Sequence, residues 1–323
     1  MNGRFVMLGA LASAFAMPAH AQGCTGGAYV VDACRKTVDL VNFLTPQLAT
    51  AQAGGNATLG QGGSLGGFGK FVLDLRATAV NGSLPKFDNV GFNATESGTK
   101  FSSANQFIPA VSLNAAIGLW RGYSLGVTHI GGVDALVTAT YLQNFDGGSI
   151  KGRLSGGNTK VGYGVRLGLL EESLLSPGVS VTYLKRDLPT ISVSGTVQGS
   201  GANPGGTIAI NNYAVKTSAW RITASKNLPV LGGLSAGIGQ DKYDASSTVA
   251  VNVNGFSSAS GAANMSMTRT NMFVGVTLNL FIAKLVGEVG QVTGGNTPAL
   301  LNDFGSPANK SRSYFTGGLR ISF

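Results

Sequence analysis

The chain has 323 residues, of which only 11% are charged and 43% are apolar, and it carries 49 glycines and a net charge of +9. The basic residues are dispersed rather than clustered, which argues against a nucleic-acid partner. Beyond the amino terminus no apolar run reaches the length of a transmembrane helix, so the chain can cross a membrane only as short strands that alternate apolar and polar residues.

The first 21 residues are typical of a secretory signal peptide. Arg4 is followed by an apolar run from Phe5 to Met17 and by an A-x-A motif that ends at Ala21. Cleavage after Ala21 is therefore expected. The run is too short to span a bilayer, which takes about 20 apolar residues. The mature chain is predicted to be exported.

The two cysteines, Cys24 and Cys34, lie just after this cleavage site. In an oxidising compartment they are expected to form a disulfide. The alternative is that Cys24 carries a lipid anchor, although position 21 lacks the leucine expected three residues before a lipidated cysteine. His129 is the one histidine of the mature chain, and we expect neither a metal nor a cofactor.

Residues 22–66 are predicted to form a separate N-terminal segment. Val30, Cys34, Val38 and Val41 recur at helical steps, so we expect a helix over residues 28–45 that ends before Pro46. The stretch AGGNATLGQGGSLGGFG follows and is typical of a loop or flexible linker. It contains no phosphate-binding fingerprint.

Residues 67–323 follow a period of two throughout, which predicts β-strands. Ten strands are expected, and twelve if the long connections hide a further pair. They fall within residues 71–79, 111–119, 133–142, 160–169, 179–186, 207–225, 234–241, 271–280, 281–292 and 313–323. Each is near the length that a tilted membrane strand requires. The fold class is therefore all-β: a transmembrane, antiparallel up-and-down barrel preceded by a short helix and a plug-like segment.

The connections alternate between long and short, as in outer-membrane barrels with external loops and periplasmic turns. This pattern places the N-terminal segment and Phe323 on the periplasmic side. A secreted β-sandwich is the alternative, but its connections would have no such order. The long connections are residues 81–106, 144–158, 187–206, 245–265 and 293–310, and the short ones are 120–123, 170–177, 226–233 and 280–281.

The last eleven residues, SYFTGGLRISF, resemble the C-terminal signal strand of bacterial outer-membrane barrels. The barrel-assembly machinery recognises that strand by a terminal aromatic residue and alternating apolar residues, and Phe315, Leu319, Ile321 and Phe323 occupy the matching positions. The resemblance implies a bacterial outer membrane, contact with its lipids and lipopolysaccharide, and assembly by that machinery. An N-terminal plug region before a barrel is similar in layout to the long-chain fatty acid transporter family, and this likeness assigns no site residue.

The inward face of the strands is predicted to be basic. Its bases are Lys70, Arg76, Lys160, Arg166, Arg186, Arg221, Arg269, Lys284 and Arg320, and its acids are Asp74, Asp134 and Glu288. Such an excess must meet water, an anionic ligand or another part of the chain, because unpaired buried charge is costly. The alternative is a lumen filled by salt-bridged side chains.

Inward positions are also rich in glycine, including Gly118, Gly168 and Gly318. Glycine in a strand often marks the close approach of another backbone. We therefore expect residues 22–66 to fill the lumen, with Asp32 and Asp39 meeting inward arginines. The alternative is a helix that packs beneath the barrel.

These features predict passage or binding of small solutes, anionic or amphipathic, through a basic lumen. A non-conducting structural or adhesive barrel that acts through its external loops is the alternative. Asp187, Asp241 and Asp244 fall near external strand ends, and no histidine is placed to join them. We therefore expect no enzyme.

Overall fold

The computed structural model describes residues 24–86, 90–146, 150–228, 232–296 and 298–323, so the signal peptide and its cleavage site lie outside the described residues. Within them the chain forms one helix, α1 (Ala28–Ala53), and fifteen strands. The strands are β1 (Phe71–Pro85), β2 (Ser103–Trp120), β3 (Tyr123–Leu125), β4 (Thr128–Ile130), β5 (Gly132–Tyr141), β6 (Phe145–Asp146), β7 (Ile150–Leu154), β8 (Thr159–Leu170), β9 (Gly178–Asp187), β10 (Ile191–Val197), β11 (Gly206–Leu228), β12 (Gly232–Val253), β13 (Ser258–Asn279), β14 (Lys284–Thr293) and β15 (Arg312–Ser322).

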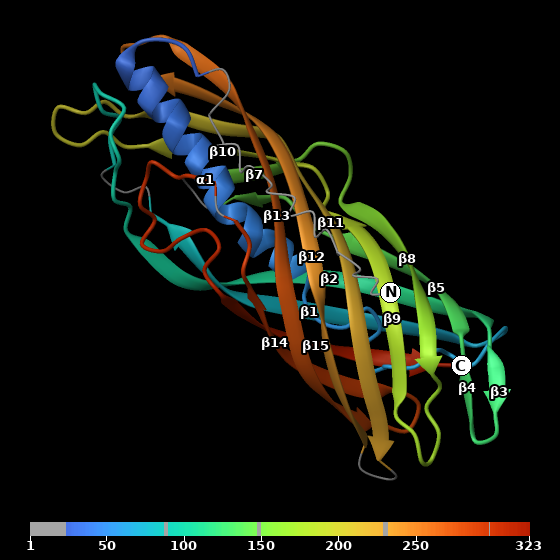
Figure 1. Cartoon of the computed structure of the whole chain (residues 1–323). Helices are drawn as coiled ribbons and strands as arrows, with labels where there is room; N and C mark the ends of the chain where they lie inside the picture. The colour runs from blue at the N-terminus through green and yellow to red at the C-terminus, as the bar shows by residue number, and fades with distance from the viewer. Residues whose placement is uncertain (1–23, 87–89, 147–149, 229–231, 297) are drawn as a thin grey trace, which may run out of the picture.

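Ten of these strands close into a ring, which confirms the predicted barrel. The ring runs β1-β2-β5-β8-β9-β11-β12-β13-β14-β15, and β15 pairs back onto β1 (Figure 1). At this seam Phe71 and Phe323 exchange backbone hydrogen bonds, and their rings stack with centroids 4.5 Å apart. Closure leaves no free edge in the ring, which is the condition for strands to span a bilayer.

The long connections contain more strand than the sequence predicts. β10, β7 and β6 extend the sheet sideways from β11, and β3 and β4 form a hairpin between β2 and β5. Residues 245–265 were expected to be a loop, and this expectation is wrong. They belong mostly to β12 and β13, which run on to a turn at residues 254–257.

Buried and exposed residues alternate along β12 and β13, but the two halves of these strands differ in which of the two sets is apolar. Near the short turns, the exposed residues are apolar, as at Ile238 and Val274, and the buried ones are polar, as at Asp241. Near the long connections, the buried residues are apolar, as at Val251 and Met265, and the exposed ones are polar. We infer that the first half faces lipid and the second half extends into water.

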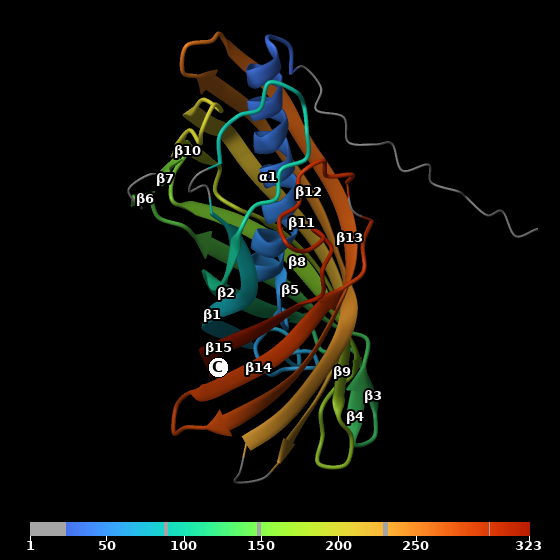
Figure 2. The same cartoon turned by 90° about the vertical axis from the view of Figure 1, so that its left-hand side faces the viewer.

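Helix α1 lies inside the ring against β11, β12, β13 and β1 (Figures 1 and 2). Twenty of its 26 residues are buried, so it has no solvated face of the usual kind. Val38, Val41 and Phe43, in the middle of the helix, pack into the apolar cluster of the wall, and Gln47 and Thr50 follow as buried polar residues.

Pro46 lies within α1, so the predicted helix end at residue 45 is wrong. A proline inside a helix removes one backbone hydrogen bond. The helix continues through Pro46 where the wall encloses it, and the Thr50 hydroxyl adds a bond to the Pro46 carbonyl at 2.7 Å, which does not replace the lost one. Local sequence rules are overridden here by burial.

The direction of α1 also differs from the expectation. Tyr29, near its start, packs against Phe256 in the β12–β13 turn, with ring centroids 4.6 Å apart. The other end of the segment, at Gly67, lies beside Gly118 and Arg121 near the short turns. The helix therefore begins at the end with the long connections, which we call the outer end. The Cys24–Cys34 disulfide is formed there, as predicted.

This direction yields a test of topology. Thr25 and Gly26 are exposed at the outer end, so an epitope inserted between them should bind antibody on intact cells. The same epitope inserted beside the exposed Leu174, in a short turn, should react only after permeabilisation. Flow cytometry measures both. Labelling of the second site alone in intact cells would show that the barrel has the opposite orientation.

Candidate functional site: the lumen and the segment that fills it

The candidate site is the lumen, together with residues 28–67, which we call the lumenal segment. Toward the outer end, its contacts are with the long connections. Lys36 pairs with Asp32 at 2.5 Å and donates to the Gly91 carbonyl, while Asp32 accepts the Asn93 backbone N–H at 2.8 Å. These bonds tie residues 90–102 to the first turns of α1.

Asp39 holds the second connection in a similar way. Its Oδ2 accepts the backbone N–H groups of Leu301 and Asn302 at 2.9 and 3.0 Å. Burial raises the pKa of the Asp39 carboxyl, and the Asn302 side chain and the Arg35 charge oppose that shift. The expectation that Asp32 and Asp39 would meet inward arginines is therefore wrong. Both carboxylates hold long connections onto the helix.

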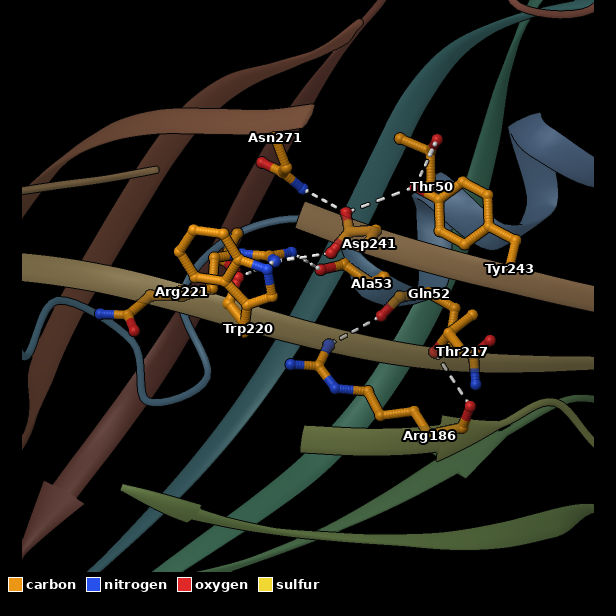
Figure 3. Close-up of polar contacts among 12 residues, drawn as sticks. Thr50, Gln52, Ala53, Arg186, Thr217, Trp220, Arg221, Asp241, Tyr243 and Asn271 are labelled. Atoms are coloured by element: carbon orange, nitrogen blue, oxygen red, sulfur yellow. Dashed lines mark hydrogen bonds and ion pairs between the residues drawn. The ribbon is translucent and has the colours of Figure 1, made fainter. Parts of the chain in front are cut away.

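The inward arginines instead bind backbone carbonyls at the end of α1. The last carbonyls of a helix have no partner within the helix, and they form the negative end of its dipole. Arg186 donates to the Gln52 carbonyl at 2.8 Å, and Arg221 donates to the Ala53 carbonyl at 2.8 Å and the Gly55 carbonyl at 3.3 Å (Figure 3). Two wall arginines thus cap the helix.

Asp241 supports this cap from behind. It is fully buried and accepts from Arg221 at 2.5 Å, from the Asn271 amide at 2.8 Å and from the Tyr243 hydroxyl at 3.3 Å (Figure 3). The Tyr314 hydroxyl donates to Asn271 at 2.7 Å. Asp241 was not among the predicted inward acids, because the sequence pattern placed the end of a strand at residue 241.

Between Ala53 and the short turns, the lumenal segment is held through its backbone. Arg76 donates to the Asn56 carbonyl at 2.5 Å, and Arg320 donates to the Leu59 carbonyl. Glu288 accepts the N–H groups of Asn56 and Gly60 at 3.0 and 3.3 Å. Ser225 accepts from Gly62 and Asp134 accepts from Leu65. This stretch has no regular secondary structure, and wall side chains replace the missing ladder.

Of the nine predicted inward bases, the six arginines are buried and the three lysines lie at the barrel ends. Arg166 pairs with Asp134 at 2.8 Å, and Arg269 donates to four carbonyls, those of Val292, Gly294, Asn309 and Lys310. Lys160 is exposed at the outer end of β8, while Lys70 and Lys284 line the opposite mouth. Asp74 accepts from Asn114 at 2.6 Å. Backbone carbonyls, more than acids, meet the arginine excess.

Three wall glycines make room for the segment. A side chain at Gly118 would meet the backbone of Gly67, one at Gly168 would meet Ser64, and one at Gly318 would meet Leu59. At Gly118 the backbone of the segment therefore approaches the wall more closely than a residue with a Cβ would allow, and at Gly168 and Gly318 the room is taken by the side chains of Ser64 and Leu59.

Within the described residues, no group of histidine, cysteine and acidic side chains could hold a metal, and no helix is both long and apolar enough to span a membrane. The outer surface explains how the chain meets lipid. Its apolar band is formed by exposed side chains from most of the ring, including Leu75, Leu113, Val165, Ile222, Ile238, Val276, Val289 and Leu319. A closed ring with such a band is an outer-membrane β-barrel.

No protein-family model matches the chain, and no curated protein matches its sequence. Among solved structures, the toluene transporter TodX of Pseudomonas putida is 14% identical, with 83% of this chain and 98% of that one covered and a TM-score of 0.35. The toluene transporter TbuX of Ralstonia pickettii is 13% identical over 94% and 96% of the chains, with a TM-score of 0.24. An outer membrane channel of Pseudomonas putida F1 is 8% identical over 81% and 97%, with a TM-score of 0.31. All three TM-scores are low, so the assignment as an outer-membrane β-barrel rests on the closed ring and its apolar band.

The cap on α1 can be tested by Arg221→Ala. The substitution leaves Asp241 buried without its ionic partner, so we expect it to lower the free energy of unfolding by about 3–5 kcal/mol. Urea-induced unfolding in detergent micelles measures the loss.

Arg153→Ala is the matched control, because Arg153 forms an ion pair with Asp146 but is about half exposed. It should change stability by less than about 1 kcal/mol. The double substitution Arg221→Ala with Asp241→Asn should recover part of the loss. Equal stability of the Arg221 and Arg153 variants would show that the cap contributes nothing.

Proposed function

We propose that the protein is a plugged outer-membrane channel for small solutes, in which the lumenal segment is a movable closure. One observation carries this proposal. Between Ala53 and Gly67 the segment is irregular and is held chiefly by hydrogen bonds from wall side chains to its backbone. Water and polar solutes can replace such bonds one at a time, because the net contribution of each bond to a charged group is only about 1.5–3 kcal/mol.

The chemistry of the wall supports polar and anionic solutes. With the segment withdrawn, Arg76, Arg186, Arg221 and Arg320 lose their carbonyl acceptors and face the lumen as donors. Some arginine nitrogens already have no partner among the described residues, including both terminal nitrogens of Arg166 and the Nε of Arg186. Guanidinium groups in such a setting favour carboxylates and phosphates.

A structural or adhesive barrel is the second candidate. It is favoured by the extension of β11–β13 past the apolar band, which ends in an exposed turn that carries Phe256. An enzymatic role is not proposed, because in the described part of the chain His129 bonds to Glu171 and not to Asp187, Asp241 or Asp244. Outer-membrane lipids are the partners of the apolar band. Lipopolysaccharide and the assembly machinery remain proposed partners.

Single-channel recording in planar bilayers tests the proposal. Deletion of residues 24–60, with the signal peptide kept, removes α1 and most of the irregular stretch. The deletion variant should conduct in steady steps and prefer anions, whereas the parent should conduct rarely. The physical reason is that twenty buried residues of α1 no longer occupy the ring.

Deletion of the β3–β4 hairpin, residues 123–130, is the control, since that hairpin lies outside the ten-strand ring. It should leave the conductance of the parent unchanged. Slower migration after boiling shows that each variant is folded. A folded deletion variant that stays silent would favour the structural or adhesive role.

A further inference from the structure

A cavity of about 810 Å³ opens at the mouth of the barrel beside the short turns. Its inner side is the end of the lumenal segment, including Gly60 and Ser64, and its rim includes the seam residues Phe71 and Phe323. It adjoins the plug contacts made by Arg320 and Ser225, and it opens at the end with the short turns, so a solute can reach it without any movement of α1. Four cationic side chains line it, those of Lys70, Lys226, Lys284 and Arg320, together with the carboxylates of Glu171 and Glu172.

Two of these cations, Lys284 and Arg320, lie where they repel each other unless an anion is bound. Lys284 and Arg320 are direct cross-strand partners of β14 and β15, on the inward face. Like charges in that relation destabilise a sheet. Arg320 is also only 3% exposed, and its Nε has no partner among the described residues. A buried donor of this kind calls for an acceptor.

The acids nearby attract Arg320 through their charge, as Asp74 and Glu172 do, but they make their hydrogen bonds with other groups. Asp74, the β1 partner of Arg320, accepts from Asn114. Glu171 binds His129 at 2.8 Å and lies 3.5 Å from Arg121. Glu172 accepts from Ser225 and from the Asn227 backbone.

Two other polar groups of the mouth are also engaged. Lys226 donates to three carbonyls of the turn, and the Phe323 carbonyl oxygen accepts from Phe71. No ion pair joins Lys70, Lys284 or Arg320 to a carboxylate in the described part of the chain.

We propose that this mouth is an anion-binding site, in which Lys284 and Arg320, with Lys70 at the rim, hold a phosphate or carboxylate group. An oxyanion between Lys284 and Arg320 accepts the free Nε–H and removes the repulsion across the β14–β15 ladder. The site goes beyond the proposed channel, because it needs no opening of the lumen. In an open channel it would concentrate anions at the periplasmic mouth.

Isothermal titration of the full-length protein in detergent with inorganic phosphate, and separately with succinate, tests the site. We expect saturable binding that weakens as ionic strength rises. Lys284→Gln should weaken phosphate binding at least fivefold. Arg320→Lys keeps the positive charge but loses the paired donors of the guanidinium group, so it should weaken binding by a smaller factor. Lys242→Gln is the control, because Lys242 is exposed on the outward face of β12, and it should bind as the parent does.

The phosphate could belong to a free anion or to a lipid headgroup. Titration in nanodiscs with and without phosphatidylglycerol separates these sources, since a bound headgroup should lower the apparent affinity for free phosphate. An unchanged affinity assigns the site to soluble anions. No saturable binding by the parent, or equal affinity of the parent and Lys284→Gln, would overturn the proposal. Because neither result depends on conductance, the test is separate from that of the channel.

Discussion

The structure depends on one constraint: the same strands must meet lipid over part of their length and water over the rest. In lipid, the outward positions of β12 and β13 must be apolar, so the polar residues turn inward. In water, the relation reverses, and Val251 and Met265 turn inward as in a soluble protein. The interior wall therefore changes from polar to apolar along one axis, as from Asp241 to Val251 along β12.

The polar half of the interior explains the arginines. A lumen lined by guanidinium groups cannot be filled by apolar side chains without leaving donors unsatisfied. A helix C-terminus and an irregular backbone supply many carbonyls in little volume, and wall glycines such as Gly118 admit them. Charge balance in this barrel is achieved between side chains and backbone dipoles, with Asp241 and Asp134 supplying the ionic share.

Much of the fold could be predicted from the sequence, because strand period, loop lengths and the terminal strand are local signals. Asp241 could also have been found, since the inward series of Ser235, Gly237, Gly239 and Asp241 continues to Tyr243. The carbonyl partners could not, because Gln52 and Arg186 are 134 residues apart and no pattern links them. The direction of α1 depends likewise on a distant contact, that of Tyr29 with Phe256.

The passage of the segment through the ring limits the order in which the molecule can be built. β1 follows the segment directly and closes the ring with β15, the last strand of the chain. Once Phe71 and Phe323 are paired, the segment is surrounded on every side, and the disulfide-bonded turn at its outer end would have to travel the length of the interior to enter. We infer that the wall gathers around the segment before the seam closes. On this inference the segment is the template on which the barrel is wrapped, and the arginine contacts to its backbone are folding contacts before they are contacts of the finished barrel.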